Sequence, residues 1–458
     1  MKNKVLTGLL LVLIGGWGNL LAQNAGSNYA RQVNTLIGTK GVGLTSGYLY
    51  PGATYPYGMV QFTPSYFSKR SGFVINQLSG GGCEHMGNFP TFPVKGKLKM
   101  SPDNILNYRI NISEEKGHAG YYEAMVQEDI KAKLTVTERT GMASYEYPAD
   151  QQYGTVIIGG GISATPIEQA AIVITAPNKC EGYAEGGNFC GLRTPYKVYF
   201  VAEFDADALE SGTWKRDELK PNTTFAEGEY SGVYFTFDVS KKKNVQYKIG
   251  VSYVSVENAR ENLKAENTGW DFLQIQNQAE SKWNHYLGKI EVEGTNPDRA
   301  TQFYTHLYRS FIHPNVCSDV NGEYMGADFR VHKSRSKHYT SFSNWDTYRT
   351  QIQLLSMLDP EVASDIVISH QLFAEEAGGA FPRWVMANIE TGVMQGDPTP
   401  ILISNAYAFG ARNYDPKPIF KIMRKGAEEP GAMSQDVEAR PGLKQYLDKG
   451  YYNASIQL

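Results

Sequence analysis

The sequence lacks the marks of several large protein classes. Its 44 Lys and Arg nearly balance its 47 Asp and Glu, so the net charge is only −3. That balance gives no electrostatic reason to expect nucleic acid or an anionic membrane as a partner. There is no CxxC or HExxH spacing for zinc, and no GxGxxG or GK[ST] loop for a nucleotide. The first hypotheses to set aside are therefore nucleic-acid binding and zinc- or nucleotide-dependent chemistry.

Long apolar runs are also scarce. A short one, Leu6–Ile14, follows two lysines and precedes a small residue, Ala22. This pattern predicts a signal peptide over residues 1–22, because the run is too short for a membrane-spanning helix. No cysteine follows it for a lipid anchor, and no later segment is apolar enough to cross a membrane. We expect an exported protein, periplasmic or extracellular, that does not span the membrane.

Cysteine is rare, and the chain has four: Cys83, Cys180, Cys190 and Cys317. In an oxidising compartment Cys180 and Cys190 could close a small glycine-rich loop. Free buried thiols are an equal alternative.

Residues 23–256 have the pattern of β structure. Leu134–Glu138 alternates apolar and polar side chains, as do parts of Tyr196–Phe204, Gly232–Asp238 and Tyr247–Tyr253. Gly, Asn, Pro and Asp interrupt these runs at short intervals. The pattern predicts an antiparallel β-sandwich rather than alternating βαβ units.

The pattern becomes helical after this region. In residues 257–295, Ile275, Ala279 and Trp283 recur near helical spacing, which predicts a helical linker. Asn296 followed by a proline then marks the start of the next helix. Paired helices with short connections predict an α/α toroid over residues 296–458.

Six motifs in this order connect the chain with a known family: Val33–Thr39, Tyr50–Gln61, Ser79–Cys83, His313–Val316, Tyr339–Arg349 and Met394–Asp397. With these motifs the chain resembles glycoside hydrolase family 92, the exo-acting, calcium-dependent α-mannosidases. The resemblance implies a β-sandwich, a helical linker and an (α/α)6 barrel, with the active site where a sandwich loop meets the barrel mouth. It also implies hydrolysis of a terminal α-mannoside with inversion, for which two carboxyls flank the sugar and a water. A Ca2+ ion would bind the sugar hydroxyls, and its ligands are left open.

The resemblance places the general acid and base in segments later than Leu458, so no catalytic residue is expected in this chain. Twelve helices at roughly twenty-five residues each would need about three hundred residues. Residues 296–458 supply about half of that, which would make the barrel partial. We therefore expect a truncated family member whose last helices expose an apolar face.

The strongest candidates for sugar binding begin a helix. Trp345 could stack on a pyranose, although a core role is the alternative. Asp346 could accept hydrogen bonds from hydroxyls, or stabilise the helix N-terminus. Arg349 could contact the sugar or form an ion pair with Asp346.

Further substrate-binding candidates lie in loops. Trp384 follows a glycine-rich stretch, and ordinary packing is its alternative. Glu390 and Asp397 could bind hydroxyls or a cation, or be solvated carboxylates; Asp397 is favoured because Gly396 and a proline flank it. The last three candidates form one run: Cys83, Glu84 and His85. A thiol beside a histidine in sequence makes no catalytic pair, so a loop that reaches from the sandwich toward the barrel is the better interpretation.

Three functions remain open at this point. The leading one is an exported α-mannosidase acting on mannose-containing glycans. The second is a non-catalytic glycan-binding protein, since the acid and base are missing. The third is another α/α-toroid hydrolase or a phosphorylase.

Overall fold

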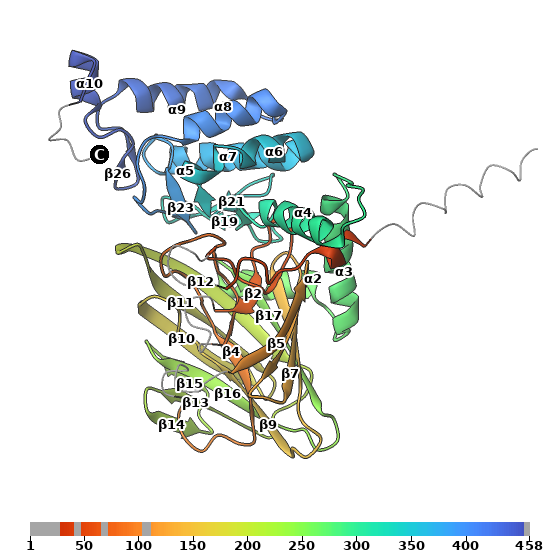
Figure 1. Cartoon of the computed structure of the whole chain (residues 1–458). Coiled ribbons are helices and arrows are strands. Elements are labelled where there is room, and N and C mark those ends of the chain that lie inside the picture. The colour runs from red at the N-terminus through yellow and green to blue at the C-terminus, as the bar shows by residue number, and fades with distance from the viewer. Residues whose placement is uncertain (1–27, 41–46, 66–71, 103–110, 453–458) are drawn as a thin grey trace, which may run out of the picture.

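The computed structural model describes residues 28–40, 47–65, 72–102 and 111–452, which form a β-sandwich, two connecting helices and a helical domain (Figure 1). The predicted sandwich followed by helices is confirmed. The predicted signal peptide, residues 1–22, lies outside the described residues. Within these ranges, no helix has both the length and the apolar composition to span a bilayer.

The sandwich consists of two sheets whose paired strands are antiparallel. The eight-stranded sheet has the order β1 (Ala53–Thr54), β2 (Gln61–Pro64), β3 (Phe73–Val74), β4 (Thr91–Lys95), β9 (Tyr153–Ile158), β16 (Ser231–Asp238), β13 (Glu210–Lys215), β14 (Glu218–Pro221). The nine-stranded sheet has the order β15 (Phe225–Glu227), β10 (Ile167–Ala176), β11 (Lys179–Phe189), β12 (Leu192–Phe204), β17 (Asn244–Ser252), β8 (Thr140–Glu146), β7 (Ile130–Val136), β6 (Tyr121–Val126), β5 (Ile112–His118).

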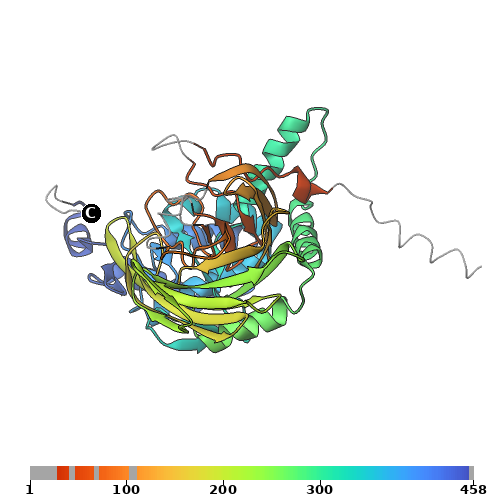
Figure 2. The ribbon, with the colours of Figure 1, turned by 90° about the horizontal axis from the view of Figure 1, so that it is seen from below.

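Strand β12 shows why these sequences make a sandwich. Tyr196, Val198 and Phe200 are buried, whereas the alternate residues Lys197 and Tyr199 are half-buried. Successive side chains of a strand point to opposite faces, so this period of two directs one face to the core. Viewed from below, the two sheets curve around a common interior (Figure 2).

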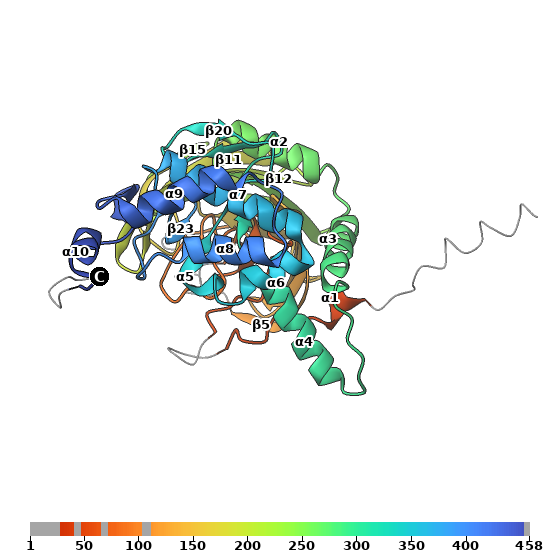
Figure 3. The same ribbon diagram turned by 90° about the horizontal axis from the view of Figure 1, so that it is seen from above.

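Helices form the connection and the second domain: α1 (Tyr29–Gln32), α2 (Val256–Glu266), α3 (Phe272–Leu287), α4 (Pro297–Ser310), α5 (Asn344–Thr347), α6 (Gln351–Leu358), α7 (Pro360–Glu376), α8 (Thr399–Phe409), α9 (Pro416–Glu428), α10 (Leu443–Lys449). Short strands pair between them: β18 (Asn315–Val316) with β21 (Tyr339–Thr340), β19 (Glu323–Met325) with β20 (Val331–Lys333), β22 (Phe342–Ser343) and β24 (Ile389–Glu390) with β23 (Trp384–Met386), β25 (Met433–Ser434) with β26 (Val437–Glu438). Figure 3 shows α6 to α9 lying across one end of the sandwich.

The helix starts follow their capping residues. Asn296 accepts from the backbone N–H of Asp298 and Arg299, and Pro297 takes the first helical position of α4. These contacts satisfy backbone donors that a helix leaves unpaired at its N-terminus.

Large apolar side chains remain exposed on the outer helices. Met357 of α6 is 57% exposed, Ile401 of α8 49% and Phe420 of α9 61%.

The junction of the two domains contains a buried ion network. The Arg139 guanidinium, between β7 and β8, contacts Glu138 at 2.5 Å and Glu266 at the end of α2 at 2.7 Å. Its Nε also donates to the Ser318 carbonyl at 2.8 Å. Lys337 pairs with the other oxygen of Glu138. The sandwich, the connecting helix and the helical domain therefore meet at one guanidinium.

Candidate active site

A cavity of about 400 Å3 lies where the sandwich meets the helical domain. This volume falls in the range of about 300–1,000 Å3 that is usual for small-molecule sites. The sandwich contributes the loop Leu78–Gly80, and the helical domain contributes the rest of the wall. The polar side chains that line it are Ser79, Arg309, His313, Ser341, Ser343, Asn344, Asp346, Thr347, Gln351 and His370.

Asp346 is the one carboxylate in the lining of this cavity, as far as the described residues show. It lies on the short helix α5, is exposed, and accepts a hydrogen bond from the Ser343 hydroxyl. Its free lone pairs can accept hydrogen bonds from the hydroxyls of a ligand.

A buried network fixes α5 against its neighbours. The Asn344 amide nitrogen donates to Thr399 Oγ1 of α8 at 2.7 Å, and its oxygen lies 3.1 Å from His370 Nε2 of α7. The Phe342 ring stacks on His370 with centroids 3.9 Å apart. Burial lowers the pKa of His370 to about 4, so the imidazole is neutral near pH 7. This network sets the direction in which the next residues, including Asp346, face.

Trp384 also lines the cavity, from strand β23. Its ring packs against Phe189, at the end of sandwich strand β11, with centroids 4.5 Å apart. Glu390 supports this strand, since its carboxylate accepts from the backbone N–H of Arg383 at 2.5 Å and of Trp384 at 3.2 Å. Burial raises the pKa of Glu390, and these backbone donors act against that rise. Glu390 is thus occupied by backbone and lies outside the lining.

Asp397 is likewise outside the cavity lining. Its carboxylate pairs with Arg440 at 2.9 Å. Burial raises the pKa of Asp397, and the Arg440 charge opposes the rise. Arg383 holds the preceding turn by donating to the carbonyls of Gly396 at 2.8 Å and Met394 at 2.5 Å. The structure therefore gives this motif a local structural role.

Trp345 and Arg349 face each other rather than the cavity. The Arg349 guanidinium lies 5.0 Å from the Trp345 ring centre and 4.9 Å from that of Tyr348. The structure does not form the ion pair with Asp346, one of the two roles left open for Arg349, because the guanidinium lies over the two rings instead.

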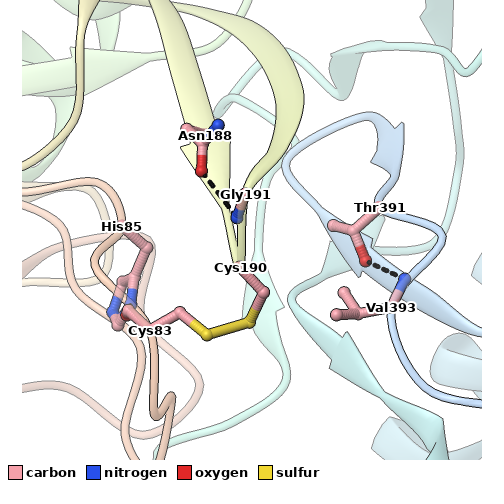
Figure 4. The surroundings of a disulfide bond; sticks show 7 residues. All are labelled: Cys83, His85, Asn188, Cys190, Gly191, Thr391 and Val393. Carbon is pink, nitrogen blue, oxygen red and sulfur yellow. Dashed lines mark hydrogen bonds between the residues drawn. A yellow bond between two sulfur atoms is a disulfide. The ribbon is translucent and has the colours of Figure 1, made fainter.

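The disulfide joins Cys83 to Cys190, which are 107 residues apart (Figure 4). A bond between Cys180 and Cys190, one of the two alternatives that the sequence left open, does not form. These two cysteines lie at opposite ends of β11, and ten residues of extended strand separate them by roughly 30 Å. Cys180 and Cys317 are free and buried, as the alternative interpretation expected for them. Because Cys83 is oxidised, it offers no thiolate for catalysis.

Glu84 and His85, the other two candidates of this run, do not line the cavity. Glu84 is exposed, and His85 is buried. His85 Nε2 accepts from the Leu78 backbone N–H at 2.9 Å, so the ring holds the loop that does line the cavity.

One group of metal-binding residue types occurs in the described part of the chain: Asp328, His332 and Glu376. It does not suit Ca2+, which takes six to eight oxygen ligands. The group offers one nitrogen and two carboxylates that are already engaged. Asp328 Oδ1 lies 2.9 Å from His332 Nε2, while Glu376 accepts from the Tyr324 hydroxyl at 2.6 Å and the Ala327 N–H at 3.0 Å.

Sequence reasoning missed several residues of the cavity wall, among them Arg309, His313 and His370. His313 begins one of the six motifs quoted above, so a signal was present. Arg309 and His370 carry no local signal, because only the packing of α4 and α7 brings them to the cavity.

Residues 32–252 match the Glycosyl hydrolase family 92 N-terminal domain, and residues 258–457 match the Glycosyl hydrolase family 92 catalytic domain. The chain belongs to glycosyl hydrolase family 92. The loop Leu78–Gly80 thus comes from the N-terminal domain of this family, and Asp346 and Trp384 come from its catalytic domain.

Solved family 92 structures share this fold. A family 92 α-mannosidase from Bacteroides thetaiotaomicron has a TM-score of 0.82 at 24% identity, covering 92% of this chain and 58% of that one. A family 92 inverting mannosidase from the same species has a TM-score of 0.79 at 23% identity, covering 93% and 59%. An uncharacterised secreted glycosidase of Arthroderma benhamiae is 25% identical, covering 93% of this chain and 55% of that protein. The chain spans a little over half the length of these relatives.

The pH dependence of stability can be tested at His313. Burial lowers its pKa from 6.5 to about 4, with the nearby charge of Arg309 acting in the same direction. The unfolded chain then binds a proton at a higher pH than the folded protein, so this contribution is complete above pH 6.5 and is lost as the pH falls toward 4. We expect the wild type to lose about 2 kcal/mol more unfolding free energy than His313→Gln between about pH 7.5 and about pH 5.

Urea titrations at the two pH values give these free energies. His306→Gln, at an exposed histidine of α4, serves as the control and should keep the wild-type pH dependence. Equal losses in the wild type and His313→Gln would contradict the prediction.

Proposed function

We propose that the protein acts on mannose-containing glycans and removes a terminal α-linked mannose by hydrolysis with inversion, assisted by Ca2+. The cavity at the domain junction carries the proposal: it is about 400 Å3 in volume and is lined by Asp346, Trp384 and hydroxyl-bearing side chains. A carboxylate for hydroxyls and an aromatic ring for C–H faces are the elements of a sugar site. A solved family 92 α-mannosidase with a TM-score of 0.81 holds mannoimidazole, which supports the choice of sugar.

The described cavity provides recognition rather than the whole reaction. An inverting hydrolysis uses two carboxyl groups, one acid and one base. Asp346 is the single carboxylate in the described lining. We assign it, with Trp384, to substrate binding, and we propose that the acid and base come from segments later than Leu458. Four further candidates for substrate binding rank below these two because they lie outside the lining: Trp345, Arg349, Glu390 and Asp397.

A second candidate, a non-catalytic glycan-binding protein, follows from the same single carboxylate.

The export of the protein is proposed from the apolar start of the sequence and from the secreted relative, and a disulfide is in keeping with an oxidising compartment.

The test measures binding on the 458-residue chain and turnover on the chain completed with its downstream sequence. Calorimetry with mannoimidazole should give a Kd in the millimolar range or tighter. The completed chain should hydrolyse an aryl α-mannoside with Ca2+ and not after EDTA. Binding without turnover favours the second candidate, and absence of binding contradicts both.

A further inference from the structure

Three backbone N–H groups fix the sandwich loop in the cavity wall. The Leu78 N–H donates to His85 Nε2 at 2.9 Å, and the Ser79 N–H donates to His313 Nε2 at 2.8 Å. The Gly80 N–H donates to the Tyr48 carbonyl at 2.9 Å. One histidine belongs to the sandwich and the other follows α4, so both domains hold the same three residues.

The neighbours of both rings require a neutral imidazole that accepts at Nε2. His85 Nδ1 lies 2.6 Å from the Cys83 carbonyl, which can only accept. His313 Nδ1 lies 2.7 Å from Asn315 Oδ1, and the nitrogen of that amide donates to the Gly58 and Ile312 carbonyls. Each Nδ1 therefore carries the proton, and each Nε2 is left with its lone pair toward the loop.

The disulfide joins the segment after the cavity loop to a sandwich hairpin that packs on a residue of the cavity wall. Cys83 follows the loop Leu78–Gly80 by three residues, and Cys190 directly follows Phe189, which packs on Trp384. Figure 4 shows the bond running from the segment with His85 to the hairpin tip where Asn188 accepts from the Gly191 N–H. The same figure shows Thr391 and Val393 of the helical domain beside it.

We infer that His85, His313 and the Cys83–Cys190 disulfide are positioning elements that fix the loop Leu78–Gly80 in the cavity wall and thereby set the affinity of the site for its sugar. The inference rests on the proposed function for the identity of the ligand. A loop that is already ordered spares the ligand the cost of ordering it on binding. His85 and the disulfide do not line the cavity, so they act on the sugar only through the loop. His313 is itself part of the lining.

Two adjacent glycines allow a matched test. A Cβ at Gly81 would lie 2.8 Å from His85 Cε1 and 3.2 Å from its Nδ1, too close for the ring to stay in place. A Cβ at Gly82 would meet nothing nearer than Tyr48 at 3.8 Å, an ordinary contact. Gly81→Ala should displace the His85 ring and release the Leu78 N–H, whereas Gly82→Ala should not.

The first measurement is the affinity for mannoimidazole by calorimetry. Gly81→Ala should bind about tenfold more weakly than the wild type, and Gly82→Ala should match the wild type. Cys190→Ala should weaken binding similarly, while Cys180→Ala, at a free buried cysteine, should not. His85→Gln keeps a hydrogen-bond acceptor and should bind more tightly than His85→Phe. A purely steric role of the ring would not predict this difference.

The second measurement is hydrogen exchange at the Leu78 and Ser79 amides, which needs no ligand. Exchange should be slow in the wild type and Gly82→Ala, and faster in Gly81→Ala and Cys190→Ala. Wild-type affinity in a folded Gly81→Ala, or unchanged exchange at both amides, would overturn the inference. If the wild type itself binds no mannoimidazole but the exchange pattern is as expected, the loop positioning stands and the proposed function fails.

Discussion

Replacing Arg139 with methionine is expected to lower the free energy of unfolding by about 3–5 kcal/mol, the cost of breaking a buried ion pair from one side. The side chains of Arg139, Glu138 and Glu266 are only 8%, 14% and 15% exposed. Removing the guanidinium leaves two carboxylates in this poorly hydrated junction without their shared cation. It also leaves the Ser318 carbonyl without its donor.

The electrostatics at Glu138 show the direction of the effect. Burial alone would raise the pKa of this carboxyl, but Arg139 and Lys337 outweigh burial and hold the pKa below its usual range. Without Arg139, only Lys337 remains to oppose the burial. Methionine retains the apolar stem and its packing, so the change isolates the loss of the charge and its hydrogen bonds.

Urea unfolding monitored by Trp fluorescence measures the change. The control is Arg424→Met on α9, which removes an exposed guanidinium paired with Glu428 four residues away. Exposed pairs contribute little, so this variant should unfold at the wild-type midpoint. Equal midpoints for both variants would show that the junction network does not stabilise the protein.

The β-sandwich and the helices were predictable because their signals are local. Alternation along Tyr196–Phe204 reflects a strand with one buried face, and Asn296 followed by Pro297 reflects the chemistry of a helix start. Both depend on residues that are neighbours in sequence. The same reasoning failed for the disulfide, since the partner of Cys190 is 107 residues away and is chosen by the pairing of whole sheets.

The candidate site was predictable only in part, for the same physical reason. Asp346 lies in the motif Tyr339–Arg349 and Trp384 follows a glycine-rich stretch, and both line the cavity. Trp345 and Arg349 belong to the same motif as Asp346, yet the helical turn points them toward each other. Glu390 has the chemistry of a ligand-binding group, but three backbone N–H groups occupy it. Which carboxylate stays free is decided by tertiary contacts that no spacing reveals.

The geometry of the cavity makes Asp346 the residue with the largest expected effect on binding. A carboxylate that accepts hydrogen bonds from two sugar hydroxyls contributes about 1.5–3 kcal/mol for each bond. Loss of both bonds in Asp346→Ala should weaken mannoimidazole binding about 100-fold or more. Ser343→Ala should have a smaller effect, since this hydroxyl lines the cavity but carries no charge, and it donates to the Asp346 carboxylate.

The binding curves of these variants also separate the role of Asp346 in binding from a role in folding. The residue is exposed on a four-residue helix, so its removal should leave the urea midpoint unchanged. Asp298→Ala provides the control: this exposed carboxylate lies in the first turn of α4, at the opposite end from cavity-lining Arg309. Asp298→Ala should bind as the wild type does. If Asp346→Ala also binds normally, the cavity at the domain junction is not the sugar site, because no other carboxylate of its described lining can replace this one.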